Sequence, residues 1–397
     1  MDLPDIASPA FKRDPFPVLA RMRAECPVAR LPAGGEMAPW LVTRHADVVA
    51  FLKDERFAKD WENVPGARLP WTPAFARPLT RNMLDRDEPD HRRLRGLIQK
   101  AFTAEVVEGI RPRIQALSSE LLDQAGRGGK VDLVRAYALP IPTIIISEML
   151  GVPAGDRARF QRWTGIIVAA DASQWAIVRA VPAIWRFIRY LRRLIAGKRR
   201  RPADDLLSAL ILASDGDDRL SEDELLAMAF LLIVAGHETT VNLISGGILT
   251  LLQHPGEAER LLAEPGLIEP AVEELLRYSG PLMTATVRFA RHDLDLAGTR
   301  IPGGGLVYAS LASANRDEAA WEHPDRLDLK RTPNRHVAFG DGSHFCAGAA
   351  LARAEARIAI LEFLRRFPGA RVSGPLEWKP GIVLRGLKAL PLDLRGA

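Results

Sequence analysis

Residues Phe339–Arg353 read FGDGSHFCAGAALAR, which places Cys346 among the glycines Gly340, Gly342 and Gly348, directly before an alanine-rich segment. That segment predicts a helix, so Cys346 is expected at a helix N-terminus, where free N–H groups and the helix dipole favour a thiolate. Glycine lets the backbone turn sharply and lets a flat ligand approach closely. A lone cysteine is most often a small buried hydrophobic residue, so the surrounding pattern has to carry any functional interpretation.

The whole stretch resembles the haem-binding loop of the cytochrome P450 family, F-G-x-G-x-H/R-x-C-x-G, at every fixed position. The resemblance implies that Cys346 is the axial thiolate ligand of a haem b group (heme b, iron protoporphyrin IX), with Gly340 and Gly348 shaping the loop. A thiolate donates electron density strongly to iron, which promotes cleavage of the O–O bond. Cys26 lies in a Glu-Cys-Pro turn without such framing, and we expect it to be structural.

The longest helical pattern covers residues 221–253 and carries the polar run AGHETT at 235–240 in its centre. Ser221 and Glu224 have the spacing of a capping box, which marks the start of the helix. About thirty residues, each rising about 1.5 Å, span on the order of 50 Å, so this helix should cross the core of a domain. Its polar centre is either a set of satisfied core residues or a functional patch.

The run at 235–240 also resembles the oxygen-activating motif of the same family, A/G-G-x-D/E-T-T/S. The resemblance implies that Thr239 hydrogen-bonds the iron-bound oxygen and that Glu238 relays protons inward from solvent. A threonine hydroxyl can bond to a carbonyl one turn earlier and open a helix locally, which makes room for a diatomic ligand and water. His237 is the variable position of the motif, and we expect it to face neighbouring helices.

Two further motifs resemble structural parts of the family. Glu274-Leu-Leu-Arg277 matches E-x-x-R, whose spacing places both side chains on one helix face. Pro324-Asp-Arg326 resembles the later P-x-R-F segment, with Leu327 in place of Phe. The resemblance implies that Arg326 completes a buried cluster with Glu274 and Arg277, which holds the loop that presents Cys346.

Haem carries two propionates that need cationic or hydrogen-bonding partners. His91 and Arg95 lie four residues apart and therefore share a helix face, Arg288 follows the E-x-x-R helix, and His344 lies two residues before Cys346. Each alone would be interpreted as a surface charge. At their matching positions, the resemblance implies that together they bind the propionates.

Helical periodicity dominates the chain, with strand-like material only near residues 28–43, 286–309 and 371–394. The class is therefore mainly α with small β-sheets. No Pro/Gly/Ser-rich linker divides the 397 residues, so 1–397 should form one domain. The resemblance implies the triangular single-domain P450 fold, with haem between the long central helix and the helix after Cys346. We predict helices near 15–25, 46–53, 88–101, 104–125, 140–149, 155–170, 176–197, 204–213, 221–253, 256–263, 267–278 and 347–366.

Composition excludes several other classes. Two cysteines cannot supply an iron–sulfur cluster or a Cys₄ zinc site, and no H-E-x-x-H pattern is present. The N-terminus lacks a signal-peptide pattern and no uncharged apolar run is long enough for a membrane span, so we expect a cytoplasmic protein. The net charge is +5, and the basic cluster at 189–201 lacks a nucleic-acid-binding motif, so it is best interpreted as a solvated helix face.

The substrate pocket can be placed only by positional resemblance, and it looks mainly apolar, which suits a medium or large organic molecule. Five tryptophans are either core residues or aromatic walls of this pocket: Trp61, Trp71, Trp163, Trp175 and Trp185. The candidate pocket residues, besides Thr239, are Leu232, Ala235, Met283, Thr284, Ile382 and Val383.

The sequence contains no flavin- or nicotinamide-binding domain, so electrons should come from a separate ferredoxin and its reductase, steered by a basic surface that includes Arg92 and Arg93. We therefore predict a monomeric, haem-dependent monooxygenase that uses O₂ to hydroxylate or epoxidise an apolar substrate, with no nucleic-acid or membrane partner. Two alternatives are a haem-thiolate enzyme with other oxidative chemistry, such as coupling or desaturation, and a non-catalytic haem or ligand-binding protein. The intact Glu238–Thr239 pair argues against the second alternative.

Overall fold

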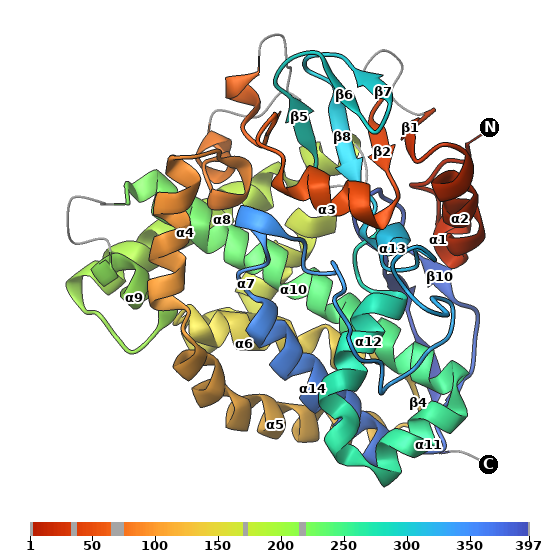
Figure 1. Ribbon diagram of the computed structural model, residues 1–397. Helices are drawn as coiled ribbons and strands as arrows, with labels where there is room; N and C mark the ends of the chain where they lie inside the picture. The colour runs from red at the N-terminus through yellow and green to blue at the C-terminus, as the bar shows by residue number, and fades with distance from the viewer. Residues whose placement is uncertain (1–2, 33–37, 65–74, 170–173, 214–219, 396–397) are drawn as a thin grey trace. The chain divides into compact units, whose positions relative to one another are not determined.

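The computed structural model describes residues 3–32, 38–64, 75–169, 174–213 and 220–395 (Figure 1). The chain forms two compact units. We call unit 1 the segments Met1–Arg68, Ile114–Leu139 and Thr239–Ala397, and unit 2 the segments Leu69–Arg113 and Pro140–Glu238. The expectation that residues 1–397 form one domain stays a prediction.

Unit 1 combines short helices with all the strands of the described chain. Its helices are α1 (Pro9–Arg13), α2 (Phe16–Glu25), α3 (His45–Lys53), α11 (Pro255–Ala263), α12 (Ile268–Ser279), α13 (Leu311–Ala314) and α14 (Ala349–Arg366). Its strands are β1 (Val28–Arg30), β2 (Trp40–Val42), β3 (Phe57–Ala58), β4 (Lys130–Asp132), β5 (Arg288–Ala290), β6 (Leu294–Leu296), β7 (Thr299–Ile301), β8 (Leu306–Ala309), β9 (Arg371–Val372), β10 (Glu377–Trp378), β11 (Leu387–Ala389) and β12 (Pro391–Asp393). A π-helical turn covers Val134–Ala138.

The largest sheet has five strands in the order β1-β2-β8-β5-β3, in which only the β2–β8 pair is parallel. Smaller sheets pair β4-β12-β9, β6-β7 and β10-β11. The β6–β7 hairpin turns at Ala297 and Gly298, whose φ values are 49° and 80°. Two consecutive positive φ angles match the twist of a tight hairpin, and they place a glycine where it is least strained.

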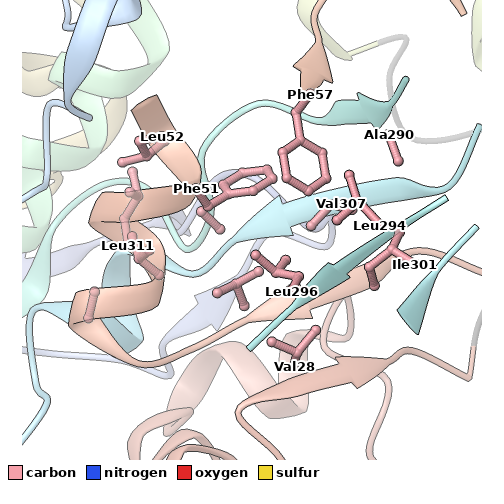
Figure 2. Close-up of a cluster of buried hydrophobic side chains, with 14 of the residues drawn as sticks. Val28, Phe51, Leu52, Phe57, Ala290, Leu294, Leu296, Ile301, Val307 and Leu311 are labelled. Carbon is pink, nitrogen blue, oxygen red and sulfur yellow. The ribbon is translucent and has the colours of Figure 1, made fainter. Parts of the chain in front are cut away.

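The core of the five-stranded sheet is closed by α3 (Figure 2). Phe51 on α3 meets Phe57 on β3 edge to face, with ring centroids 4.7 Å apart. Val307 on β8 and Leu311 on α13 are fully buried in the same cluster. Because α3 is fixed by this packing, its C-terminal carbonyls are held in a defined position beside the sheet.

The regular elements of unit 2 are all helices in its described residues. Its helices are α4 (Asp90–Ala101), α6 (Pro140–Met149), α7 (Ala154–Ala169), α8 (Gln174–Arg200) and α9 (Leu206–Ala213), while α5 (Ala104–Gly126) and α10 (Glu222–Gln253) contribute residues to both units. Phe187 on α8 joins its neighbours, with ring centroids 5.4 Å from Phe160 on α7 and 5.9 Å from Phe230 on α10. These aromatic contacts pack α7, α8 and the first half of α10 together.

The long helix α10 starts where the sequence predicts. The N–H of Ser221 donates to Oε2 of Glu224 at 2.8 Å, and the N–H of Glu224 donates to Oγ of Ser221 at 3.1 Å, which is a complete capping box. By length and composition α10 could cross a membrane, but 61% of its most apolar window is buried, as in the core helix of a soluble protein.

The predicted mainly α class with small sheets is confirmed, and every predicted helical segment contains an α-helix. The sequence missed α1, α13, β3 and β4. These elements are two to five residues long, too short for a hydrophobic period to be recognised, and tertiary contacts define them.

Candidate functional site

The loop before α14 presents Cys346 as an exposed residue at a helix N-terminus. Its backbone N–H donates to the carbonyl of Phe339 at 2.9 Å, which closes the loop. Gly340 and Gly342 have φ values of 74° and 72°, and Gly348 is the N-cap residue of α14. Gly340 and Gly342 therefore lie at turns of the backbone, Gly348 lies at the start of α14, and Cys346 lies between Gly342 and Gly348.

Gly342 also allows the loop to approach α3. A Cβ atom at this position would lie 3.0 Å from the carbonyl oxygen of Leu52, in addition to the strain of the positive φ. The Nζ of Lys53 pairs with Oδ2 of Asp341 at 2.9 Å, across half-exposed side chains. The C-terminal end of α3 thus supports the loop that carries Cys346.

Arg288, a predicted propionate partner, is buried on β5 at the same end of α3. Its Nη2 donates to the carbonyl of Leu52 at 2.8 Å and its Nη1 to that of Phe51 at 3.4 Å. The guanidinium also stacks over the Phe51 ring at 5.5 Å from the centroid. Arg288 and the glycine-framed loop therefore both approach the carbonyl of Leu52, so the structure brings Arg288 close to the loop.

A buried carboxylate on α12 organises the segment that leads into the loop. Both side chains of the Glu274–Arg277 pair are fully buried, and two hydrogen bonds of 2.8 Å join them. Arg331 adds contacts of 3.2 Å from its Nε to both oxygens of Glu274. Glu274 also accepts from the N–H of Asp328 at 3.0 Å and from Nδ2 of Asn334 at 3.1 Å.

The prediction that Arg326 completes this cluster is wrong. The side chain of Arg326 is exposed, and only its carbonyl takes part, accepting from Nη2 of Arg277 and of Arg331 at 3.1 Å each. Leu327 is buried, so the chain turns inward after Arg326 and returns at Arg331 with a guanidinium facing Glu274. The third member of the cluster is therefore five residues later than the motif suggested.

A second glutamate of α12, Glu273, binds residues before and after the loop, and the sequence analysis missed it. Arg353 donates from Nε and Nη2 to the two oxygens of Glu273, each at 2.7 Å, and Nε2 of His336 lies 3.1 Å from Glu273. Burial alone would raise the pKa of Glu273, but these hydrogen bonds lower it to about 2. Arg353 also stacks on Phe339 at 4.5 Å, so this cluster contacts both ends of the cysteine loop. The available signal was the adjacent pair Glu273-Glu274 in the α12 sequence.

The polar centre of α10 has an uneven exposure. Glu238 and Thr239 are half-buried, whereas Ala235 and Gly236 are exposed within an otherwise apolar helix. His237 is 6% exposed, and its Nδ1 lies 3.1 Å from the carbonyl of Ile233, one turn earlier. The ring is therefore held along its own helix.

Two of the predicted propionate partners lie on α4, in unit 2. His91 is buried, with its Nδ1 3.5 Å from Oε1 of Glu88, and Arg95 is half-buried one turn later. Burial, and to a smaller extent the charge of Arg95, lowers the pKa of His91, against the opposing effect of Glu88. His344 lies in the 3₁₀ turn Gly342–His344 of unit 1. That these residues share one site with Arg288 stays a prediction.

The residues around Cys346 fit a haem. In the part of the chain that the structure describes, no group of three His, Cys, Asp or Glu side chains could hold a bare metal ion. An exposed thiol at a helix N-terminus suits the iron of a haem, for which a cysteine thiolate is an established kind of protein ligand. The buried guanidinium of Arg288 at the edge of the loop supplies a donor suited to a carboxylate.

Residues 39–373 match the sequence model of the family described as Cytochrome P450. The chain belongs to the cytochrome P450 family. It is 41% identical to the polyketide biosynthesis cytochrome P450 PksS of Bacillus subtilis, over 97% of this chain and 96% of PksS. The solved structure of PksS matches with a TM-score of 0.92 and covers 99% of this chain and 100% of PksS.

Two other relatives agree. The chain is 46% identical to the cytochrome P450 monooxygenase PikC of Streptomyces venezuelae, over 97% of this chain and 92% of PikC. A myxobacterial cytochrome P450, CYP267B1, in complex with myristic acid matches with a TM-score of 0.91 at 41% identity, covering all of both chains. The predictions of a bacterial-type P450 fold and of a monooxygenase are thus confirmed, and the family implies a haem cofactor.

In this P450, two predicted pocket segments of unit 1 lie side by side. The N–H groups of Met283 and Thr284 donate to the carbonyl of Val383 at 2.8 and 3.4 Å, and Oγ1 of Thr284 donates to that of Ile382 at 3.4 Å. Met283 and Thr284 are buried, whereas Ile382 and Val383 are half-buried. Leu232 and Ala235, on the unit 2 part of α10, are half-buried and exposed, respectively.

The tryptophans of the P450 differ from one another. Trp163 packs on Tyr190 with ring centroids 5.8 Å apart, and Trp61 is half-buried against a small cluster of the sheet. Trp185 is 48% exposed. Trp71 and the side chain of Trp175 lie outside the described residues.

Proposed function

We propose that this P450 hydroxylates or epoxidises a medium-to-large apolar organic molecule, with haem b bound through Cys346 and electrons from a ferredoxin and its reductase. The observation that carries the proposal is the exposed Cys346 in its glycine-framed loop before α14. The name of PksS supports a polyketide as the kind of substrate, and the myristic acid bound by CYP267B1 supports an apolar chain. We further propose a monomeric, cytoplasmic enzyme, in keeping with the largely buried α10.

Haem, when bound, supplies the reductive activation of O₂. Cys346 would bind the iron as a thiolate, which the N-terminus of α14 stabilises. Arg288 would donate to a propionate, with His91, Arg95 and His344 as its companions. Thr239 would hold a proton at its Oγ1 beside the reacting oxygen, and the carboxylate of Glu238 would renew that proton from solvent.

Incubation of the holoenzyme with ¹⁸O₂, NADPH, a ferredoxin, its reductase and a panel of macrolides and fatty acids tests this function. One labelled oxygen atom in the product, formed in step with NADPH consumption, is the expected result. A dehydrogenated or coupled product without label would replace the proposal by the alternative oxidative chemistry.

Replacing Thr239 by alanine should lower product formation roughly 10²-fold, the usual scale of a lost proton-transfer group, while NADPH consumption continues. The hydroxyl that holds the proton is removed, so reduced oxygen leaves as hydrogen peroxide. Product and peroxide are measured per NADPH consumed. Thr239→Ser keeps the hydroxyl and should keep most of the coupling; equal coupling in both variants would reject the role of Thr239.

Of the two predicted ferredoxin-docking residues, we propose Arg92. Its side chain is 83% exposed and pairs with Glu88 at 3.3 Å, whereas Arg93 is 25% exposed and pairs with Glu224. Arg92→Glu should slow the reduction of the enzyme by ferredoxin about tenfold at low ionic strength. The difference in rate between the variant and the unaltered enzyme should shrink as salt is added. Arg135 is equally exposed at 83%, so Arg135→Glu is the matched control. Stopped-flow reduction rates that are the same for the two variants would contradict the docking role.

A further inference from the structure

A cleft of about 760 Å³ lies in unit 1. It is lined by the start of α2, the second half of α10, the end of α12 and the β10–β11 pair. Of the described residues that line it, none belongs to the loop Phe339–Gly348, and neither Arg288 nor Thr239 is among them. The cleft is therefore separate from the loop that carries Cys346, and its size is within the usual range for small-molecule sites.

One wall of the cleft is a ladder in which arginines alternate with aromatic rings. The guanidinium of Arg316 lies 3.7 Å from the ring centroid of Tyr278 and 4.1 Å from that of Phe16. The guanidinium of Arg385 lies 5.5 Å from the Phe16 centroid and 4.3 Å from that of Trp378. Stacking fixes each guanidinium plane and leaves its edges for in-plane hydrogen bonds.

The two arginines differ in how their edges are used. Arg316 pairs with Asp325 at 2.6 Å and donates to the carbonyl of Tyr278 at 2.7 and 3.2 Å. Arg385 donates from Nε to the carbonyl of Lys12 at 3.1 Å. Across the described residues, neither Nη of Arg385 has a hydrogen bond or an ion pair. Arg385 thus brings to the cleft two Nη donors that have no hydrogen bond among the described residues.

Burial, and after it the charge of Arg316, lowers the pKa of Arg385 to about 10, while Asp14 opposes this. The guanidinium is still charged at neutral pH. Lys12, buried behind it, adds positive potential whenever it is protonated. The pKa of Lys12 is lowered to about 7 by burial and by Arg385, so this contribution is partial at neutral pH.

A second, independent feature also points to a ligand. Asn242 on α10 lines the cleft at 2% exposure, and neither its Oδ1 nor its Nδ2 has a hydrogen-bond partner among the described residues. Its amide packs over Gly386, where a Cβ atom would lie 2.0 Å from Oδ1. Buried side-chain amides are nearly always hydrogen-bonded, so this one is suited to a ligand group in the cleft.

We propose that this cleft binds an organic carboxylate, with its anionic group between the Nη atoms of Arg385 and the amide of Asn242. A guanidinium fork matches the two oxygens of a carboxylate, and Nδ2 of Asn242 adds a third donor. The apolar body packs against Phe16, Leu249 and Leu387, which line the same cleft. Asp14 and Asp325 on the lining disfavour a doubly charged phosphate, so a single negative charge on an apolar molecule fits better.

Calorimetric titration of the holoenzyme with 1-naphthoate, its neutral analogue 1-naphthamide and inorganic phosphate tests the proposal, with the haem Soret band recorded in parallel. Saturable binding of 1-naphthoate without a Soret shift is expected. 1-Naphthamide should bind about tenfold more weakly because it loses the charge-assisted bonds, and phosphate about tenfold more weakly because it loses the apolar contact. Equal affinity for the amide or for phosphate would overturn the carboxylate site. Binding accompanied by a Soret shift would place the probe at the haem and overturn it as well.

Two exposed aspartates that line the cleft, Asp14 and Asp325, form what we call its rim. Variants of these residues test the proposal even if an Arg385 variant does not fold. Asp14 is exposed and Asp325 is 73% exposed, so Asp14→Asn and Asp325→Asn should each tighten 1-naphthoate binding about two- to fivefold by removing a repulsive charge. Asp293, which is 58% exposed and paired with Arg300 at 2.9 Å, is the matched control, and Asp293→Asn should change nothing. Arg385→Gln should weaken binding at least about tenfold. Affinities that are unchanged in both rim variants would refute the site even if Arg385→Gln fails to fold.

Discussion

The variant Cys346→Ala is expected to lose haem. Any haem that it retains should lack the red-shifted Soret band that marks a thiolate ligand in the reduced carbon monoxide complex. Alanine preserves the helix start but removes the thiol that we propose as the iron ligand. Monooxygenase activity should fall to background. Haem content per protein and the carbon monoxide difference spectrum are the measurements.

Cys26 is the matched control for this variant. It packs at the edge of a buried cluster that includes Leu19 and Met22, away from any glycine-framed loop. Cys26→Ala should therefore keep the haem spectrum and cost only about 1 kcal/mol of unfolding free energy, as an ordinary substitution does. If Cys346→Ala retained haem with an unaltered spectrum, the thiolate assignment would be rejected, whatever the control shows.

How well the sequence predicts this molecule depends on how local each signal is. The glycines around Cys346 and the capping box of α10 each lie within about ten residues. Their geometry is decided by the backbone that they form, and the structure reproduces it. The buried pair of Glu274 and Arg277 is equally local, because a spacing of three on a helix fixes it.

The partners of that pair are not local. Arg326 and Arg331 are both arginines after the same proline, and no periodicity distinguishes them. The path of the chain decides: Leu327 is buried, Arg326 faces solvent, and the turn at Asp328 brings Arg331 to Glu274. Glu273 was missed for the same reason, because its partners lie 63 and 80 residues later in the chain. Long-range ion pairs need the tertiary path, which a single sequence does not specify.

This path has a direct consequence for stability, because two adjacent glutamates of α12 bind the segments that flank the cysteine loop. Glu274 binds the segment that leads into the loop, and Glu273 binds His336 before it and Arg353 after it. Asn315 extends the first network, since its Oδ1 accepts from the N–H of Val337 at 2.8 Å. Loss of a charge among the partners of Glu274 should therefore destabilise α12 and also loosen the segment that leads into the loop of Cys346.

Arg331→Ala is expected to lower the free energy of unfolding by about 3–5 kcal/mol, the scale for a buried charge cluster that loses one member. Glu274 is fully buried, and it would keep its bonds to Arg277 but lose the two contacts from Arg331. Arg326→Ala removes an exposed side chain and keeps the carbonyl that accepts the hydrogen bonds, so it should change stability by less than about 0.5 kcal/mol. Guanidinium unfolding of the holoenzyme, followed by circular dichroism and haem absorbance, separates the two variants. Because both variants delete an arginine from the same segment, the difference between them isolates the position of the charge. A larger loss for Arg326→Ala would restore the original motif assignment and place the third charge of the cluster five residues earlier.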